Sequence, residues 1–200
     1  MDLSGATIMI LGGSGLVGHA VARRVLLCRP NRVVLVALSE RETEDAATGL
    51  RPLAGDAAVV TEYGNVYLPA TLARLDRETL LDDAAHRRLL VDDIFGDLTE
   101  ELLSRSFLVQ LFVKHRPDAV VDCINTATAF AYQDVYRSSR DLVASAARGA
   151  ADQATIERHI LTQPIPQLTR HIQILVEGLK RAGARAYVKI GTSGDRKSVV

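Results

Sequence analysis

A short apolar run followed by closely spaced glycines opens the chain: Thr7-Ile8-Met9-Ile10-Leu11-Gly12-Gly13-Ser14-Gly15-Leu16-Val17-Gly18. An apolar run with glycines directly after it predicts a buried strand that ends in a tight turn. Apolar residues then recur at helical spacing and stop before the turn dipeptide Pro30-Asn31, so a helix is expected after the glycines. This order of strand, glycine turn and helix predicts a dinucleotide-binding element.

Each of the three spaced glycines has a physical role in such an element. Gly12 permits the tight turn, Gly15 lets a diphosphate approach the backbone, and Gly18 allows the helix to pack close to the sheet. Unpaired amides at the start of the helix then meet the phosphates. The alternative is a glycine-rich turn without a ligand. The loop residues expected to bind a cofactor are Gly12, Gly13, Ser14, Gly15, Leu16, Val17 and Gly18.

Apolar runs of this kind recur between helical patterns. They span residues 7–11, 32–38, 57–61, 119–124 and 186–190. Runs that are apolar on both faces are typical of parallel strands covered by helices. The sequence therefore predicts an α/β fold, a Rossmann-type doubly wound parallel sheet with helices on both faces.

The helical patterns carry their own boundary signals. Ser39 and Glu42 form a capping box, which predicts a helix from about residue 40, and Pro164 and Gly183 bracket the last helix. The apolar face expected for the first helix consists of Val17, Val21, Val25 and Cys28. The face expected for the last helix consists of Leu168, Ile172, Leu175, Val176 and Leu179.

Residues 68–115 form a leucine-rich, helix-patterned stretch that is longer than a minimal unit of this fold needs. We expect a helical insertion between the third and fourth strands. Its use is either an added helical layer or an oligomer contact, so a homodimer is one expected arrangement.

Composition narrows the class of protein. Two hundred residues, 48% of them hydrophobic, suit one domain with a sizeable core. The 24 basic and 24 acidic residues are interspersed, which argues against nucleic acid or an anionic membrane as a partner. We see neither a signal peptide nor a membrane span, and we expect a cytoplasmic chain. Cys28 and Cys123 are interpreted as buried reduced thiols, and the scattered histidines predict no metal site.

The glycine spacing, with three residues from the first to the second glycine, resembles the extended short-chain dehydrogenase/reductase superfamily. Residues 29–40, 115–122 and 175–193 are similar, in the same order, to its nucleotide-sugar 4,6-dehydratase and epimerase branch. The resemblance implies NADP or NAD as cofactor and a small hydroxyl-bearing substrate, a nucleotide sugar in that branch. A carbonyl or alcohol reductase of the same superfamily and a non-catalytic dinucleotide sensor are the alternatives.

The resemblance also implies roles for residues at the strand ends. Arg41 beside Ser39 would suit the 2′-phosphate of NADP, whereas Glu40 would suit the free 2′-hydroxyl of NAD; Ser39 and Glu40 also read simply as a helix start. Asn65, followed by Val66, falls where relatives bind the adenine amino group, although a plain turn fits equally. The segment expected to pass the nicotinamide ribose is Asn125, Thr126 and Ala127.

The catalytic residues implied by the resemblance are incomplete in this chain. Ser193, or Thr192 beside it, matches the family's serine position, but no tyrosine has a lysine four residues further on. We therefore expect residues 1–194 to be an incomplete dinucleotide-binding domain without its substrate lobe. Residues 195–200 break the family pattern, and one encoding of them reads as a sequencing-adapter oligonucleotide, so we interpret them as a non-native tail; a genuine polar C-terminus is the alternative.

Overall fold

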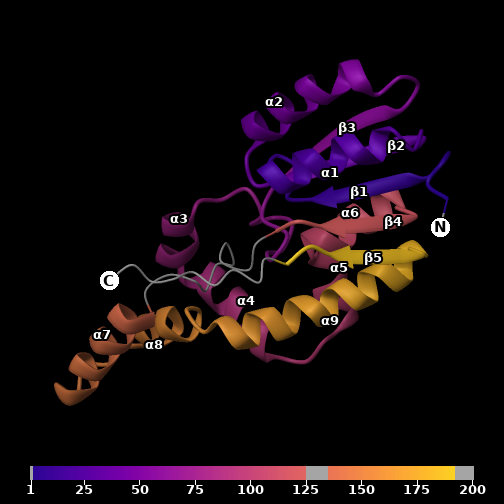
Figure 1. Cartoon of the computed structure of the whole chain (residues 1–200). Coiled ribbons are helices and arrows are strands. Elements are labelled where there is room, and N and C mark those ends of the chain that lie inside the picture. Colours follow the sequence, from indigo (N-terminus) through magenta and orange to yellow (C-terminus); the bar gives the residue numbers. More distant parts are fainter. Residues whose placement is uncertain (1, 125–134, 192–200) are drawn as a thin grey trace.

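A computed structural model of the chain describes residues 2–124 and 135–191. In the described residues, five strands form one parallel sheet in the order β3-β2-β1-β4-β5 (Figure 1). The elements are β1 (Thr7–Leu11), α1 (Leu16–Leu26), β2 (Arg32–Ala37), α2 (Glu40–Leu50), η1 (Arg51–Leu53), β3 (Ala58–Tyr63), α3 (Arg77–Asp82), α4 (Ala84–Phe95), α5 (Glu100–Arg105), α6 (Phe107–His115), β4 (Ala119–Asp122), α7 (Val135–Ala147), α8 (Gln153–Ile160), α9 (Pro164–Ala182) and β5 (Ala186–Lys189).

The strand order reverses at β1. The chain runs outward from β1 to β2 and β3, and then crosses back to place β4 on the other side of β1. Met9 of β1 accordingly pairs with Val34 of β2 on one side and with Val120 of β4 on the other. This is the order of a Rossmann fold, in which ligands bind at the carboxyl ends of the strands where the order reverses. The predicted fold class is confirmed.

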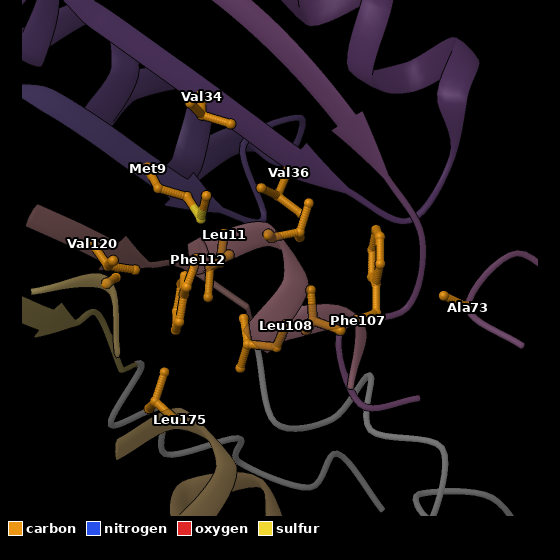
Figure 2. Packing of buried hydrophobic residues seen from close by; sticks show 13 residues of the cluster. Met9, Leu11, Val34, Val36, Ala73, Phe107, Leu108, Phe112, Val120 and Leu175 are labelled. Atoms are coloured by element: carbon orange, nitrogen blue, oxygen red, sulfur yellow. The ribbon is translucent and has the colours of Figure 1, made fainter. Parts of the chain in front are cut away.

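Helices cover both faces of the sheet, because alternate strand residues point to opposite sides. Met9, Val34 and Val120 lie on the face covered by α6 and α9, where Phe112 and Leu175 pack against them (Figure 2). The opposite face is covered by α1 and α2 (Figure 1). Its buried residues include Ile8, Ile10, Val33, Leu35, Ala22, Val25, Ala47 and Leu50.

The leucine-rich stretch forms α3, α4, α5 and α6. The connecting helix α6 packs on the sheet beside α9. Helix α4 instead packs against α8 and α9. A separate buried apolar cluster lies within this layer, and it consists of Leu68, Leu72, Leu80, Leu90 and Leu161. The expected insertion is thus an added helical layer; a homodimer contact stays a prediction. In the described part of the chain, no helix has the length and apolar character of a membrane span.

The predicted buried faces of the first and last helices were partly wrong. Cys28 and Val17 are exposed, and α1 instead buries a stripe that includes Gly18 and Ala22. In α9 the buried stripe is Gln167, His171, Leu175, Gly178 and Ala182. It is rotated from the expected one because small and polar residues fit the close contacts here, notably Gly178 against the ring of Phe112.

Helix boundaries follow the signals in the sequence. The Oγ of Ser39 accepts a hydrogen bond from the Glu42 amide at 3.4 Å, so Ser39 caps α2 as predicted. Gly183 ends α9 in the left-handed conformation, with φ of 70°. Helix α2 therefore begins shortly after β2 ends, and β5 begins shortly after α9 ends.

Candidate functional site

The glycine turn joins three strands at the carboxyl edge of the sheet. The amides of Gly12 and Gly13 both donate to the carbonyl of Val36, at 2.8 and 3.0 Å, which ties the end of β1 to β2. Gly12 has φ of 77°, and a Cβ there would lie 3.1 Å from the carbonyl carbon of Cys123 beyond β4. A side chain at this position would therefore be both strained and crowded.

Gly18 and Gly15 fulfil the two other roles expected of the motif. A Cβ on Gly18 would collide with the Gly12 carbonyl and would lie 2.9 Å from the Cα of Gly13, so only glycine lets α1 pack against the turn. At Gly15, which caps α1, the one neighbour within 4 Å of a Cβ among the described residues is the Gly12 oxygen at 3.4 Å. The residues that the structure describes therefore leave the space in front of Gly15 open.

The start of α1 is suited to an anion. Its first amides have no carbonyl partner within the helix, and the helix dipole adds a partial positive charge there. The first turn contains no acidic residue, and Leu16 directs a 95% exposed side chain away from the protein. The backbone from Ser14 to Val17 thus has the open, positively polarised character that a diphosphate requires.

A cleft of about 360 Å³ runs along this edge of the sheet, across the glycine turn. It extends from the β2–α2 and β3 ends on one side of the turn to the β4 end on the other. Its lining residues are Gly12, Ser14, Gly15, Val36, Ala37, Leu38, Glu42, Gly64, Asn65, Val66, Tyr67, Cys123 and Ile124.

Asn65 and Val66 lie in the cleft at the end of β3, where the resemblance placed the adenine site. The Asn65 carboxamide oxygen accepts a hydrogen bond from the Tyr67 amide at 3.0 Å, so the side chain stabilises its own turn. A carbonyl oxygen can accept a second hydrogen bond. The turn and the ligand-binding interpretations are therefore compatible in one geometry.

The expected ribose site differs in detail. Glu40 and Arg41 are exposed and do not line the cleft, and the Arg41 guanidinium lies 3.8 Å from the carboxylate of Asp45. Leu38 and Glu42 line the cleft instead. Glu40, Arg41 and Glu42 are the first three residues of α2, so their side chains point in different directions around the helix axis. Glu42 is the one of the three that lines the cleft.

Two groups of predicted residues lie outside the described part of the chain. They are Asn125, Thr126 and Ala127 after β4, and Thr192 and Ser193 after β5. The residues just before the first group, Cys123 and Ile124, line the cleft. The role of Asn125, Thr126 and Ala127 beside the nicotinamide ribose stays a prediction.

A polar cluster that sequence reasoning missed lies beside the β4 end of the cleft. The Tyr187 hydroxyl donates to Oδ2 of Asp122 at 2.8 Å, and Nζ of Lys189 lies 2.9 Å from the same oxygen. Burial and the Asp122 carboxylate raise the pKa of Tyr187, so its phenol stays protonated at neutral pH. In this arrangement the Tyr187 hydroxyl is a hydrogen-bond donor to Asp122.

The signal for this cluster was the alternation of β5. Tyr187 and Lys189 are two residues apart on a strand and share a face, and the register pairs Lys189 with Asp122. Only the spatial order of the strands, with β4 beside β5, brings the carboxylate to them. In the described residues, no three His, Cys, Asp or Glu side chains gather as metal ligands would.

No protein-family model matches the chain, and no curated protein matches it. Similar solved structures include a short-chain dehydrogenase from Shigella flexneri, at 13% identity over 98% of this chain and 65% of that one, with a TM-score of 0.47. Another is L-sorbose reductase from Gluconobacter frateurii complexed with NADPH and L-sorbose, at 14% identity, 96% and 97% coverage, and a TM-score of 0.33.

A third similar structure is Pen from Bacillus thuringiensis, at 15% identity over 76% of this chain, with a TM-score of 0.36. The chain spans 50% of the length of Pen and 65% of the length of the Shigella protein. Likeness at this level assigns neither a family nor an activity. The function of the chain is therefore inferred from its own cleft.

Proposed function

We propose that the chain is the NAD(P)-binding domain of an oxidoreductase-type epimerase or dehydratase. The observation that carries the proposal is the glycine turn. It leaves the start of α1 uncovered at the point where the strand order reverses, within a cleft long enough to extend to both sides of the turn. A dinucleotide has this form, with a central diphosphate and one nucleoside on either side.

The lining of the cleft supports the following placement of such a cofactor. The amides from Ser14 to Val17 would hold the diphosphate, and Asn65 would face the adenine. The other nucleoside would extend towards Cys123 and Ile124. When bound, the nicotinamide would exchange a hydride with the carbon that carries a substrate hydroxyl.

Both cofactors remain in the proposal, NAD and NADP, and Glu42 favours the first. Its carboxylate is the acidic group in the part of the cleft beside β2, where it would accept a hydrogen bond from a ribose hydroxyl and repel a 2′-phosphate. Arg41, the residue that would have suited the phosphate, is exposed outside the cleft.

The substrate is proposed from the sequence resemblance: a nucleotide sugar whose hydroxyl is oxidised to a keto intermediate. Ser193 or Thr192 would orient that hydroxyl, whereas the tyrosine and lysine that supply the general base in the family have no match in residues 1–200. A simple carbonyl or alcohol reductase uses the same half of the fold, and a sensor would bind the cofactor without turnover. Residues 1–194 would then be incomplete for catalysis, and turnover of a sugar nucleotide by the 200-residue chain would refute this part.

Titration with NADH and NADPH tests the proposal. Nicotinamide fluorescence is expected to rise when either dinucleotide binds to the native chain. Gly15→Trp should abolish the rise by filling the space in front of α1. Leu27→Trp is the matched control, since it adds the same indole at an exposed position beyond the far end of α1. A folded native chain that binds neither dinucleotide would overturn the proposal.

A further inference from the structure

Asp122, at the end of β4, holds the backbone that follows it. One carboxylate oxygen, Oδ1, accepts the Ile124 amide at 2.9 Å. The other, Oδ2, lies 2.9 Å from Nζ of Lys189, and the same ammonium donates to the Ile124 carbonyl at 2.6 Å. Both peptide groups of Ile124 are thus held by one ion pair.

Burying the Asp122–Lys189 ion pair carries a desolvation penalty that calls for an explanation. Asp122 is only 3% exposed, and a buried charge destabilises a fold unless it is paired and hydrogen-bonded. A purely structural role would be to join β4 to β5. These strands are already joined at their other ends, where Arg185 pairs with Asp118 at 2.8 Å. The Asp122–Lys189 pair differs from that one in holding the backbone at the cleft.

The held backbone is the part of the cleft wall beyond the glycine turn. Cys123 and Ile124 both line the cleft. The Gly12 position is so close to them that a Cβ there would lie 3.2 Å from the Ile124 nitrogen. Movement of Ile124 would therefore change the shape of the cleft on the β4 side, while the Leu38 and Asn65 side is formed by other strands.

We infer that Asp122 and Lys189 are positioning residues, which fix the Cys123–Ile124 backbone so that the cleft accepts the second nucleoside of a dinucleotide. The inference rests on the proposed function. Neither side chain needs to touch the ligand. The pair supports the nicotinamide half and leaves the adenosine diphosphate half to the glycine turn.

The test compares Lys189→Met with Arg185→Met, which removes the matched ion pair at the opposite ends of the same two strands. Affinities for NADH and for ADP are measured by calorimetry, and exchange of the Ile124 amide by NMR. Lys189→Met should weaken NADH binding about tenfold, equivalent to about 1.4 kcal/mol, and leave ADP binding within about twofold. The Ile124 amide should exchange faster, and Lys189→Arg should restore NADH binding.

Arg185→Met should change neither affinity. Asp122→Asn is a second variant, because it keeps an acceptor for the Ile124 amide but removes the charge that holds Lys189; it should also weaken NADH selectively. Equal losses of ADP and NADH, or an equal loss in Arg185→Met, would overturn the inference. So would a native chain that binds ADP as tightly as NADH, although the glycine turn would then stand. A native chain that binds neither ligand would overturn the inference and the proposed function together.

Discussion

The rings of Tyr67 and His171 lie against each other, with 4.2 Å between their centroids and 32° between their planes. Tyr67 lines the cleft and His171 comes from α9, so the helix supports the cleft wall from behind. Burial lowers the pKa of His171 to about 4, opposed by Asp122 and assisted by Lys189. Burial and Asp122 raise the pKa of Tyr67 to about 12. Both rings are neutral at physiological pH.

His171 should make the stability of the fold depend on pH. Its pKa is about 4 in the folded chain and near 6.5 when unfolded, so the unfolded state binds the extra proton between these values. The contribution of His171 to the free energy of unfolding should be complete above pH 6.5 and should decrease as the pH drops towards 4. The expected loss is about 3 kcal/mol, measured by urea unfolding across this range. His171→Phe keeps a ring against Tyr67 and should flatten this part of the profile; an unchanged slope would contradict the assignment.

Two helical glycines should respond oppositely to alanine. A Cβ at Gly178 would lie 2.7 Å from Cδ2 of Phe112, whose ring is fully buried and cannot move aside. Gly178→Ala should therefore destabilise the fold by about 1–3 kcal/mol. Gly49→Ala, in α2, meets only Nε2 of His19 at an ordinary 3.6 Å and should stabilise by about 0.5–1 kcal/mol. Chemical denaturation measures both, and a gain at Gly178 would show that α9 packs differently.

The added helical layer should depend on one buried ion pair. The Arg87 guanidinium of α4 lies 2.9 Å from Glu157 of α8, and both side chains are only 8% exposed. Glu157→Ala leaves a buried cation unpaired and should cost about 3–5 kcal/mol in thermal or urea unfolding. Asp45→Asn, which removes the exposed partner of Arg41, should change stability by less than about 0.5 kcal/mol. Equal effects would mean that Arg87 finds another partner.

Glu42 should set the preference between the two cofactors. Replacing it with glutamine removes the negative charge from the part of the cleft beside β2, and the ratio of NADPH to NADH affinity should rise about two- to fivefold. Glu40→Gln is the matched control, because Glu40 is exposed two residues earlier on α2 and does not line the cleft. A larger shift from Glu40→Gln would place the ribose on the other side of α2.

Local signals predicted much of the fold because they act over short distances. The glycine motif places the turn, Ser39 caps α2, and Gly183 ends α9, each through the conformation of a few neighbouring residues. The observed strand order is that of the Rossmann class, which the alternation of apolar runs and helical patterns predicted. The buried face of α9 was less predictable, because Gly178 and His171 are buried by shape and by contact with particular rings and not by hydrophobicity.

The candidate site was predictable where one segment forms it and not where several segments meet. Gly12, Ser14, Gly15 and Asn65 line the cleft, and their segments follow strands directly. Glu42 was missed because a helix turn, and not a strand end, presents it. The contact of Asp122 with Lys189 depends on two strands separated by more than sixty residues of sequence, and no spacing within either segment encodes it.

The glycine turn also bears on how such a chain can diverge. The turn presents backbone amides and open space to a ligand. Most side-chain substitutions leave both unchanged. Leu16, with its exposed side chain, could change freely, whereas the neighbours of Gly12 and Gly18 restrict these two positions to glycine. Distantly related proteins would then share little in this loop beyond the spacing of its glycines.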